Sequence, residues 1–412
     1  MADEQLRKQL YEEVKIANGL EVEGINYDPE IFQDYLKEHP DQSQQYHMLD
    51  CSINDTSAFL APKQVRVGHG FPTRGFSTNF KSPYKLIRQA DGFYIEKEGI
   101  VLSKATLADS PEWYNKKSSS GLYLKDICQS PGSLAHGEGC VFTCYSNECA
   151  LSMCGKDCRF CNIASTKKRF AEREGNIWKK PKDIGEAVKA AFDEGYDHFN
   201  ISGGFIPERR ELDYYLDVAE AIQDETGLED FNGTAVIGAP EDLSILERYK
   251  EAGYRTVAIH PEVWGEAWFN SICPGKAETN GGFKHYLEAV DEAVQIFGRG
   301  RVRTQFVSGL QPKQDVIEGL EYFAAKGAIP FTIQWVPAIG SAFEGHRTPN
   351  EEWHWDMLLK NYEILKRNGY TYEQVYDVIP DWRQYADFYR IDNHIDKGTP
   401  LFEDKRKKIN FQ

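Results

Sequence analysis

The sequence predicts an α/β fold: a partial β/α barrel of six repeats, with an N-terminal cap domain and a small helical, aromatic C-terminal domain. Three observations lead to this expectation. Short apolar stretches alternate with amphipathic helical ones, a cysteine-rich loop follows the first apolar stretch, and neither flank continues the alternation. We expect a cap or substrate-docking domain over 1–127, a four-cysteine metal loop over 128–149, the barrel over 150–340 and the C-terminal domain over 341–412.

The six apolar stretches have the length and composition of buried parallel strands. The predicted strands are Ala150–Met153, His198–Ser202, Thr234–Ile237, Thr256–His260, Val302–Val307 and Phe331–Val336. The predicted helices that accompany them are Lys182–Glu194, Glu208–Thr226, Asp242–Ala252, Glu266–Ile272, Phe283–Phe297 and Asp315–Lys326. Six repeats are too few to close an eight-stranded barrel, so we expect an open sheet with ligands at the carboxyl ends of its strands.

The composition of the chain limits the partners it can have. Its 412 residues suffice for two or three domains, and its net charge of −16 disfavours the phosphate backbone of nucleic acids. No apolar run approaches the ~18 residues of a membrane span, and the N-terminal residues mix charges unlike a secretory signal. Six of the nine cysteines fall between Cys140 and Cys161, which is typical of metal binding. We expect an oxygen-sensitive cytoplasmic protein.

Cys154, Cys158 and Cys161 follow the first predicted strand at C-x3-C-x2-C spacing. Full thiolate ligation of a 4Fe–4S cluster takes four cysteines, so a cluster held by three has one open iron. Phe160 offers an aromatic face beside such a cluster. A structural zinc site is the alternative, although zinc normally takes four ligands at other spacings. The motif resembles the signature of radical S-adenosylmethionine (SAM) enzymes, which implies that SAM chelates the open iron and is cleaved to a 5′-deoxyadenosyl radical.

Glycines stand where the second predicted strand ends. Ser202 is followed there by Gly203 and Gly204, and glycine lets backbone N–H and C=O groups approach a ligand closely. The resemblance to radical SAM enzymes implies that this turn holds the SAM amino group. An ordinary strand-to-helix turn is the alternative interpretation.

Polar residues end two of the later predicted strands. Glu262 follows the fourth strand and suits a ribose hydroxyl or the SAM amine, with a surface carboxylate as the alternative. At the fifth strand, we expect backbone groups around Gln305 and Ser308 to contact an adenine edge. Two cysteines, Cys51 and Cys273, are isolated in the sequence, and we expect structural roles for them.

A second group of cysteines lies just upstream of the triplet. Cys128, Cys140, Cys144 and Cys149 have C-x11-C-x3-C-x4-C spacing in a stretch rich in glycine and other turn formers. Four thiolates in such a loop suit a tetrahedral site for one metal ion, and iron and zinc both fit. A second cluster and a set of buried free thiols are the alternatives.

Both flanks carry aromatic residues outside the predicted barrel. Tyr114 lies in the segment Pro111–Lys116, and we expect this loop to cover the site when substrate is absent. A phenolate oxygen is an acceptable iron ligand, so Tyr114 is a candidate ligand of the open iron; an exposed loop aromatic is the alternative. The tail after Pro337 is rich in tryptophan and tyrosine, which either pack onto the barrel or enclose a large flat cofactor.

The cysteine triplet, the upstream four-cysteine loop, the six repeats and the aromatic tail together resemble the methanogenesis marker protein 10 family. Its members are cobalamin-dependent radical SAM methyltransferases of methanogenic archaea. The resemblance implies methylation of an sp3 carbon in an arginine side chain of the catalytic subunit of methyl-coenzyme M reductase, with a low-potential electron donor as a further partner. It also implies a mononuclear iron on the four upstream cysteines, a 4Fe–4S cluster on the triplet and cobalamin bound by residues 341–412.

One segment departs from the general cobalamin-binding pattern D-x-H-x-x-G. Asp392–Gly398 is one residue longer than this pattern, so no histidine is assigned to cobalt. The implied target needs radical chemistry, because an sp3 carbon of arginine has neither a lone pair nor an acidic proton, and such chemistry belongs to cofactors. Two other functions stay open: a radical SAM peptide-modifying enzyme without cobalamin, and a non-enzymatic metal-stabilised scaffold or electron carrier.

Overall fold

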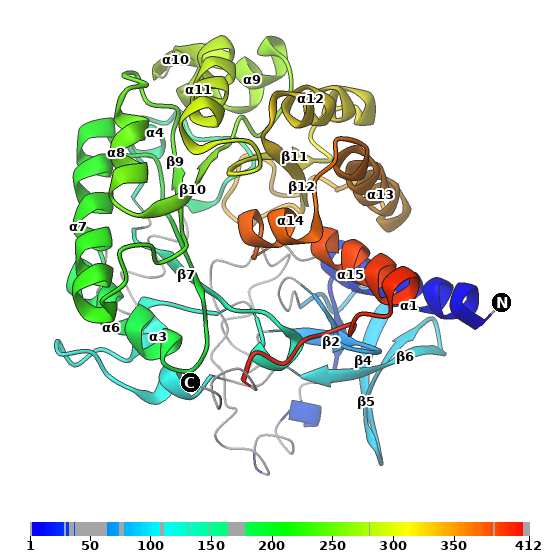
Figure 1. Cartoon of the computed structure of the whole chain (residues 1–412). Coiled ribbons are helices and arrows are strands. Elements are labelled where there is room, and N and C mark those ends of the chain that lie inside the picture. The colour runs from blue at the N-terminus through cyan, green and yellow to red at the C-terminus, as the bar shows by residue number, and fades with distance from the viewer. Residues whose placement is uncertain are drawn as a thin grey trace.

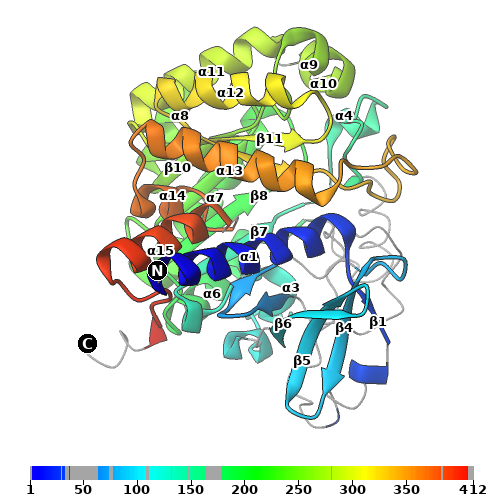
Figure 2. The ribbon, with the colours of Figure 1, turned by 90° about the vertical axis from the view of Figure 1, so that its right-hand side faces the viewer.

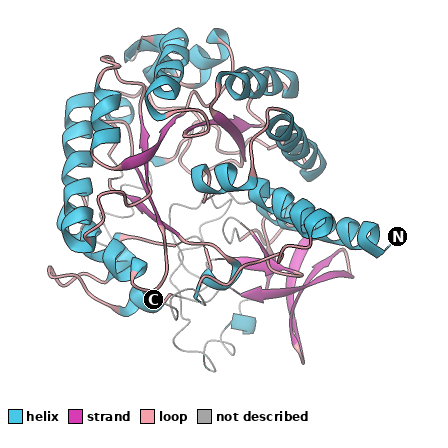
Figure 3. Cartoon of the chain, viewed as in Figure 1, coloured by secondary structure: helices cyan, strands magenta, loops and turns pink. Residues whose placement is uncertain are grey.

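A computed structural model of the chain contains two six-stranded sheets, which lie one above the other in Figure 1. The structure describes residues 2–28, 30–32, 37, 64–73, 78–107, 111–130, 132–146, 148–163, 178–279, 281–381 and 384–406. Cys51 and, in the aromatic tail, Trp382 lie outside these residues. Figure 3 shows that helices surround the upper sheet, whereas the lower sheet has long hairpin strands.

The upper sheet is parallel throughout, and its strands follow chain order. The strands are β7 (Cys140–Cys144), β8 (His198–Ser202), β9 (Gly233–Ile237), β10 (Tyr254–Ile259), β11 (Val302–Ser308) and β12 (Ile329–Gln334). The accompanying helices are α6 (Pro181–Phe192), α7 (Glu208–Thr226), α8 (Ile245–Glu251), α9 (Glu266–Ile272), α10 (Pro274–Thr279), α11 (Gly282–Phe297) and α12 (Lys313–Lys326), and they lie outside the curved sheet (Figure 1). The predicted open, partial α/β barrel is confirmed.

The prediction for the first strand is wrong. Residues Ala150–Met153 form the short helix α4, and the first strand is β7, within the stretch expected to be a metal loop. β7 pairs in parallel with β8 from Cys140 opposite His198 to Cys144 opposite Ser202. Val141 and Phe142 suit a strand, whereas alanine, leucine and methionine favour a helix. Met153 is 75% exposed, which a strand buried on both faces would not allow.

The lower sheet belongs to the N-terminal part of the chain. Its strands are β1 (Asn26–Tyr27), β2 (Val65–Val67), β3 (Phe71–Pro72), β4 (Tyr84–Gln89), β5 (Gly92–Lys97) and β6 (Ile100–Leu107), in the order β1-β4-β5-β6-β2-β3. All of its pairings are antiparallel except that of β1 with β4. Val65, Leu86 and Ile95 pack in a hydrophobic cluster of its own. This sheet was not predicted from the sequence.

Helix α1 (Ala2–Glu23) lies between the two sheets, as Figure 2 shows. Ile16 and Leu20 belong to the cluster of the lower sheet, whereas Leu10 and Val14 belong to the large core around the parallel sheet. The helix therefore joins the two parts through a different apolar face on each side.

The C-terminal segment forms α13 (Glu351–Arg367), α14 (Tyr372–Val378) and α15 (Gln384–Lys397). Helices α15 and α1 lie side by side (Figures 1 and 2), and Asp392 accepts hydrogen bonds from Arg7 of α1 and from Tyr362 of α13. Phe388 is buried, with ring centroids 5.4 Å from Tyr11 and 5.1 Å from Tyr362. These aromatic side chains therefore pack within the protein. None of the described helices is long and apolar enough to cross a membrane.

Candidate active site

The cysteine triplet lies at the carboxyl ends of the parallel strands, as the sequence predicts. Helix α4 begins where the N–H of Ala150 donates to the carbonyl of Phe205, just beyond the end of β8. Cys154 is exposed at the C-terminus of α4, and Cys158 and Cys161 are half-buried in the loop that follows. Phe160 is partly buried against the large core. The parallel sheet therefore presents three thiols in one short loop at its ligand-binding edge.

The three thiols lie on one loop, but their side chains do not converge on one point. Among the described residues, no three His, Cys, Asp or Glu side chains converge as ligands of one ion. A hydrogen bond with the Cys273 thiol lowers the pKa of Cys158, and the nearby ammonium of Lys276 acts in the same direction against burial. Thiolates are the form that binds metals, so this chemistry of the loop fits an iron–sulfur cluster.

Cys273, which is isolated in the sequence, lies beside the triplet in the structure. Its buried thiol is hydrogen-bonded with Cys158, and the structural role expected for it stays a prediction. Burial and the bond with Cys158 raise the pKa of Cys273. No spacing rule links these two cysteines, since the contact arises only when the strands assemble.

The turn after β8 uses its glycines to accommodate the chain that leads to the triplet. A Cβ on Gly203 would lie 2.3 Å from the ring of Tyr145, and one on Gly204 would lie 2.1 Å from the carbonyl oxygen of Glu148. The Ser202 carbonyl accepts from the N–H of Tyr145 at 2.9 Å. Close packing against Tyr145 and Glu148 therefore requires the glycines, independently of any ligand.

Glu262, three residues after β10, meets Gln305 in the middle of β11. The Gln305 side-chain amide donates to Oε2 of Glu262 at 3.3 Å, and Lys276 Nζ donates to Oε1 at 2.7 Å. Glu262 is 9% exposed, so it is not a surface carboxylate. Ser308 lies elsewhere: its hydroxyl donates to the Ile333 carbonyl at 2.8 Å.

A buried histidine two residues before Glu262 lacks one hydrogen-bond partner among the described residues. His260 directly follows β10, and its Nδ1 has no partner in the part of the chain that the structure describes. Burial lowers the pKa of His260, so its ring is neutral. A buried polar atom is normally satisfied, and this one fits a site that receives a polar ligand.

The four upstream cysteines do not gather around one point. Cys140 and Cys144 occupy opposite ends of β7, roughly 13 Å apart by the usual rise of a strand. Cys128 ends the short helix α3 (Leu124–Ile127), and Cys149 precedes α4. No four-thiolate arrangement is present among the described residues, so the mononuclear iron stays a prediction.

Three of the four upstream cysteines nevertheless share one neighbourhood. Cys128 and Cys144 both lie close enough to Tyr214 to raise its pKa, and Cys144 and Cys149 do the same for Tyr145. Burial raises the pKa of Cys128 to about 12 and also raises that of Cys144, while Lys179 opposes both shifts. In this arrangement Cys128 and Cys144 are protonated, which agrees with the alternative of buried thiols.

Tyr114 is buried rather than exposed on a loop. It lies in the 3-10 turn η2 (Glu112–Asn115), with its ring centroid 4.6 Å from that of Trp113. The Ser130 N–H donates to its hydroxyl at 2.8 Å. Burial raises the pKa of Tyr114, and Cys128 adds to the shift, so the structure places a neutral phenol beside Cys128.

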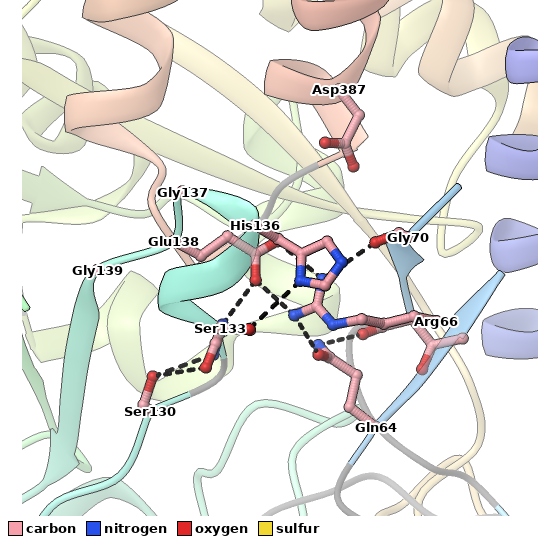
Figure 4. A network of polar contacts seen from close by, with 12 residues as sticks. Gln64, Arg66, Gly70, Ser130, Ser133, His136, Gly137, Glu138, Gly139 and Asp387 are labelled. Carbon is pink, nitrogen blue, oxygen red and sulfur yellow. Dashed lines mark hydrogen bonds and ion pairs between the residues drawn. The ribbon is translucent and has the colours of Figure 1, made fainter. Parts of the chain in front are cut away.

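A buried ion pair that the sequence did not reveal ties the lower sheet to β7. Arg66 of β2 and Glu138 are 2% and 0% exposed, and Nη2 lies 2.5 Å from Oε2 (Figure 4). Arg66 also donates to the Gly70 carbonyl and to Gln64, each at 3.0 Å, and the Ser133 N–H donates to Glu138 at 2.8 Å. This network fixes residues 132–139, which lead directly into β7.

Comparisons with known proteins agree with this geometry. Residues 151–327 match the family model of the Radical SAM superfamily. Bacteriochlorophyllide c C-7(1)-hydroxylase of Chlorobaculum limnaeum is 31% identical over 269 residues, which cover 62% of this chain and 65% of that relative. The chain thus spans just under two thirds of the length of this curated relative.

Two solved structures are similar over part of the chain. Methylornithine synthase matches with a TM-score of 0.42 and 15% identity, over 58% of this chain and 68% of that one. The FeFe-hydrogenase maturase HydG matches with a TM-score of 0.45 and 16% identity, over 63% of this chain and 57% of that one. The match over residues 151–327 contains the whole cysteine triplet, so this part of the chain is similar to the radical SAM superfamily.

Proposed function

We propose that the chain is a cobalamin-dependent radical SAM methyltransferase that methylates an sp3 carbon of an arginine side chain in the catalytic subunit of methyl-coenzyme M reductase. The observation that carries the proposal is the three-cysteine loop at the carboxyl ends of an open parallel sheet, within the part of the chain that is similar to the radical SAM superfamily. This similarity implies an enzyme that uses a 4Fe–4S cluster and SAM.

The residues of this chain fit the first part of that chemistry, the binding of the cluster and of SAM. Cys154, Cys158 and Cys161 would hold the cluster, and Glu262 would receive the amine or a ribose hydroxyl of SAM. When bound, the cluster and SAM supply a carbon-centred radical that removes hydrogen from an unactivated carbon. The protein then has to orient the target carbon beside the bound SAM and to exclude water.

The net charge and the whole-chain resemblance support the arginine target and the cobalamin. A net charge of −16 favours a cationic partner such as an arginine-bearing peptide, with modest specificity. The whole-chain resemblance described above implies cobalamin in residues 341–412. The described aromatic side chains Tyr362, Phe388 and Tyr389 pack against one another, so no residue is assigned to cobalamin.

One comparison favours a second function, that of a radical SAM enzyme without cobalamin. The 31% identical relative is named a hydroxylase of bacteriochlorophyllide c, and a radical SAM enzyme without cobalamin would need no cofactor site among the aromatic tail residues. This alternative predicts the same loop and the same SAM cleavage. It differs in the absence of bound cobalamin and in the mass of the product.

Anaerobic turnover tests the proposal in two stages. Protein reconstituted with iron and sulfide is incubated with SAM and a strong reductant, and 5′-deoxyadenosine is quantified; a Cys158→Ala variant is the control. An arginine-containing reductase peptide is then added, with and without cobalamin, and its mass is measured. We expect one added methyl group on arginine only with cobalamin. Formation of 5′-deoxyadenosine without methylation would refute the methyltransferase, and no 5′-deoxyadenosine would refute the radical SAM chemistry itself.

A further inference from the structure

The cysteine loop is hydrogen-bonded to the end of α9 and to the first turn of α10. The N–H of Arg159 donates to the Ile272 carbonyl at 2.9 Å, and its Nε donates to the Ser271 carbonyl at 2.7 Å. The N–H of Gly275 donates to the Lys156 carbonyl at 3.1 Å. These bonds place the first turn of α10 directly beside the loop.

Lys276, in that first turn, extends away from solvent toward the strand ends. Its side chain is 14% exposed, and its Nζ donates to the His260 carbonyl at 3.0 Å and to Glu262 at 2.7 Å. The Tyr286 ring centroid lies 5.6 Å from the same ammonium. A buried ammonium is stable only when it is paired, and Glu262 supplies the pairing charge.

The backbone of Glu262 is held in an unusual conformation. Its φ of 69° lies in the left-handed region, which is rare for a residue that is not glycine. Its N–H donates to the Gln305 carbonyl at 3.2 Å, and its carbonyl accepts from the Val307 N–H at 2.7 Å. Strand β11 therefore fixes the backbone of Glu262 through both its N–H and its carbonyl, an arrangement typical of strained residues at functional sites.

The side chain of Glu262 is fixed at the same time. Each carboxylate oxygen accepts from a different residue, Oε1 from Lys276 and Oε2 from Gln305. A carboxylate oxygen has two acceptor sites, so each retains capacity for a ligand donor. Two residues earlier in the chain, the buried Nδ1 of His260 has no partner among the described residues, and the ammonium of Lys276 acts on both side chains.

We propose that Lys276 is a positioning residue for SAM: its ammonium fixes the Glu262 carboxylate at the strand ends, where that carboxylate receives the amine or a ribose hydroxyl of SAM. This inference rests on the proposed function. Because Lys276 stands in the helix whose first turn holds the cysteine loop, it couples the position of the cluster ligands to that of the SAM-binding carboxylate.

Lys276→Met and the double variant Lys276→Met/Glu262→Gln test this role. The single variant leaves Glu262 buried without its cation, whereas the double variant removes both charges together. Lys284→Met is the matched control, because Lys284 is 89% exposed on the following helix. For each protein, the dissociation constant of SAM is measured by equilibrium dialysis and expressed per reconstituted cluster. Thermal stability and amide exchange of residues 302–308 are measured on the protein without iron.

The expected results separate positioning from stability. Lys276→Met should raise the dissociation constant of SAM about tenfold or more, as expected for the loss of an oriented charge-assisted contact. It should also accelerate exchange at Val307. The double variant should recover thermal stability but not SAM affinity, and Lys284→Met should match wild type in every measurement.

Two results would overturn the inference in different ways. Wild-type affinity for SAM in Lys276→Met, or full recovery of affinity in the double variant, would mean that Lys276 has a structural role only. If wild-type protein with a complete cluster bound no SAM, the proposed function would fail and this inference with it.

Discussion

Replacing Glu138 by Gln should destabilise the connection between the lower sheet and β7 by about 3–5 kcal/mol. That range is the cost of removing one partner from a buried ion pair, because the other charge is left without compensation. Arg66 is 2% exposed and already has an unpartnered Nε among the described atoms, so it has little access to water. The introduced amide would keep an acceptor oxygen for the Ser133 N–H, so the change isolates the charge.

Amide exchange measured by mass spectrometry on residues 132–144 is the suitable assay, since a chain with two sheets need not unfold in one step. Exchange there should accelerate by about two to four orders of magnitude, by the rule of tenfold per 1.4 kcal/mol. Adding Arg66→Met should restore most of the protection, because both charges are then absent. Asp193→Asn is the control: its exposed pair with Lys189 should contribute well under about 1 kcal/mol. Acceleration below tenfold in Glu138→Gln would show that water solvates Arg66 and that the reasoning is wrong.

Three further predictions concern the cysteine loop and the pH dependence of stability. In Gly275→Ala, the added Cβ would lie 2.4 Å from the Lys156 carbonyl oxygen, so the cysteine loop should shift. The iron and sulfide content per protein should then fall; unchanged content would show that the contact between α10 and the cysteine loop does not position the cluster ligands. Burial raises the pKa of Glu211 to about 8, so the folded state binds a proton that the unfolded state releases, and the free energy of unfolding should fall as pH rises from about 4.5 to 8; this slope should disappear in Glu211→Gln in urea titrations at several pH values. Burial, aided by Arg66, lowers the pKa of His136 to about 4, so the unfolded state binds protons first, and stability should fall as pH falls from about 6.5 to 4; a His136→Phe variant with the same acid slope would exclude this origin.

The barrel could be predicted because its signal is local. Each parallel strand is a short apolar run beside an amphipathic helix, so five of the six strands appear where the sequence places them. The first strand was misplaced because the cysteines of Cys140–Cys144 suggested a metal loop, which hid the strand character of Val141 and Phe142. The lower sheet was missed for a different reason: Ile100, Val101 and Leu102 of β6 are all exposed, so that strand lacks the alternation that marks one buried face.

The contacts around the candidate site could not be predicted from spacing. Glu262 was expected at a strand end, but its partner Lys276 lies on α10, and the two meet only because that helix folds back under the cysteine loop. Cys273 meets Cys158 for the same reason. The pairing of Arg66 with Glu138 joins the lower sheet to the segment before β7, and no pattern within either segment specifies it.

The parts of the chain outside the barrel converge on the segment that leads into β7. Beside the ion pair from the lower sheet, the Tyr376 hydroxyl of α14 donates to the Gly137 carbonyl at 2.7 Å, and the Lys405 N–H donates to the Leu134 carbonyl at 2.9 Å. At its central residue, β7 is paired by Gln129, whose backbone exchanges hydrogen bonds with Phe142. An edge strand of an open sheet is otherwise free to slip or pair elsewhere. Because the cysteine loop follows β7 within a few residues, these contacts fix the register of the strand and, through it, the place of the three thiols; the flanks therefore belong to the architecture of the candidate site.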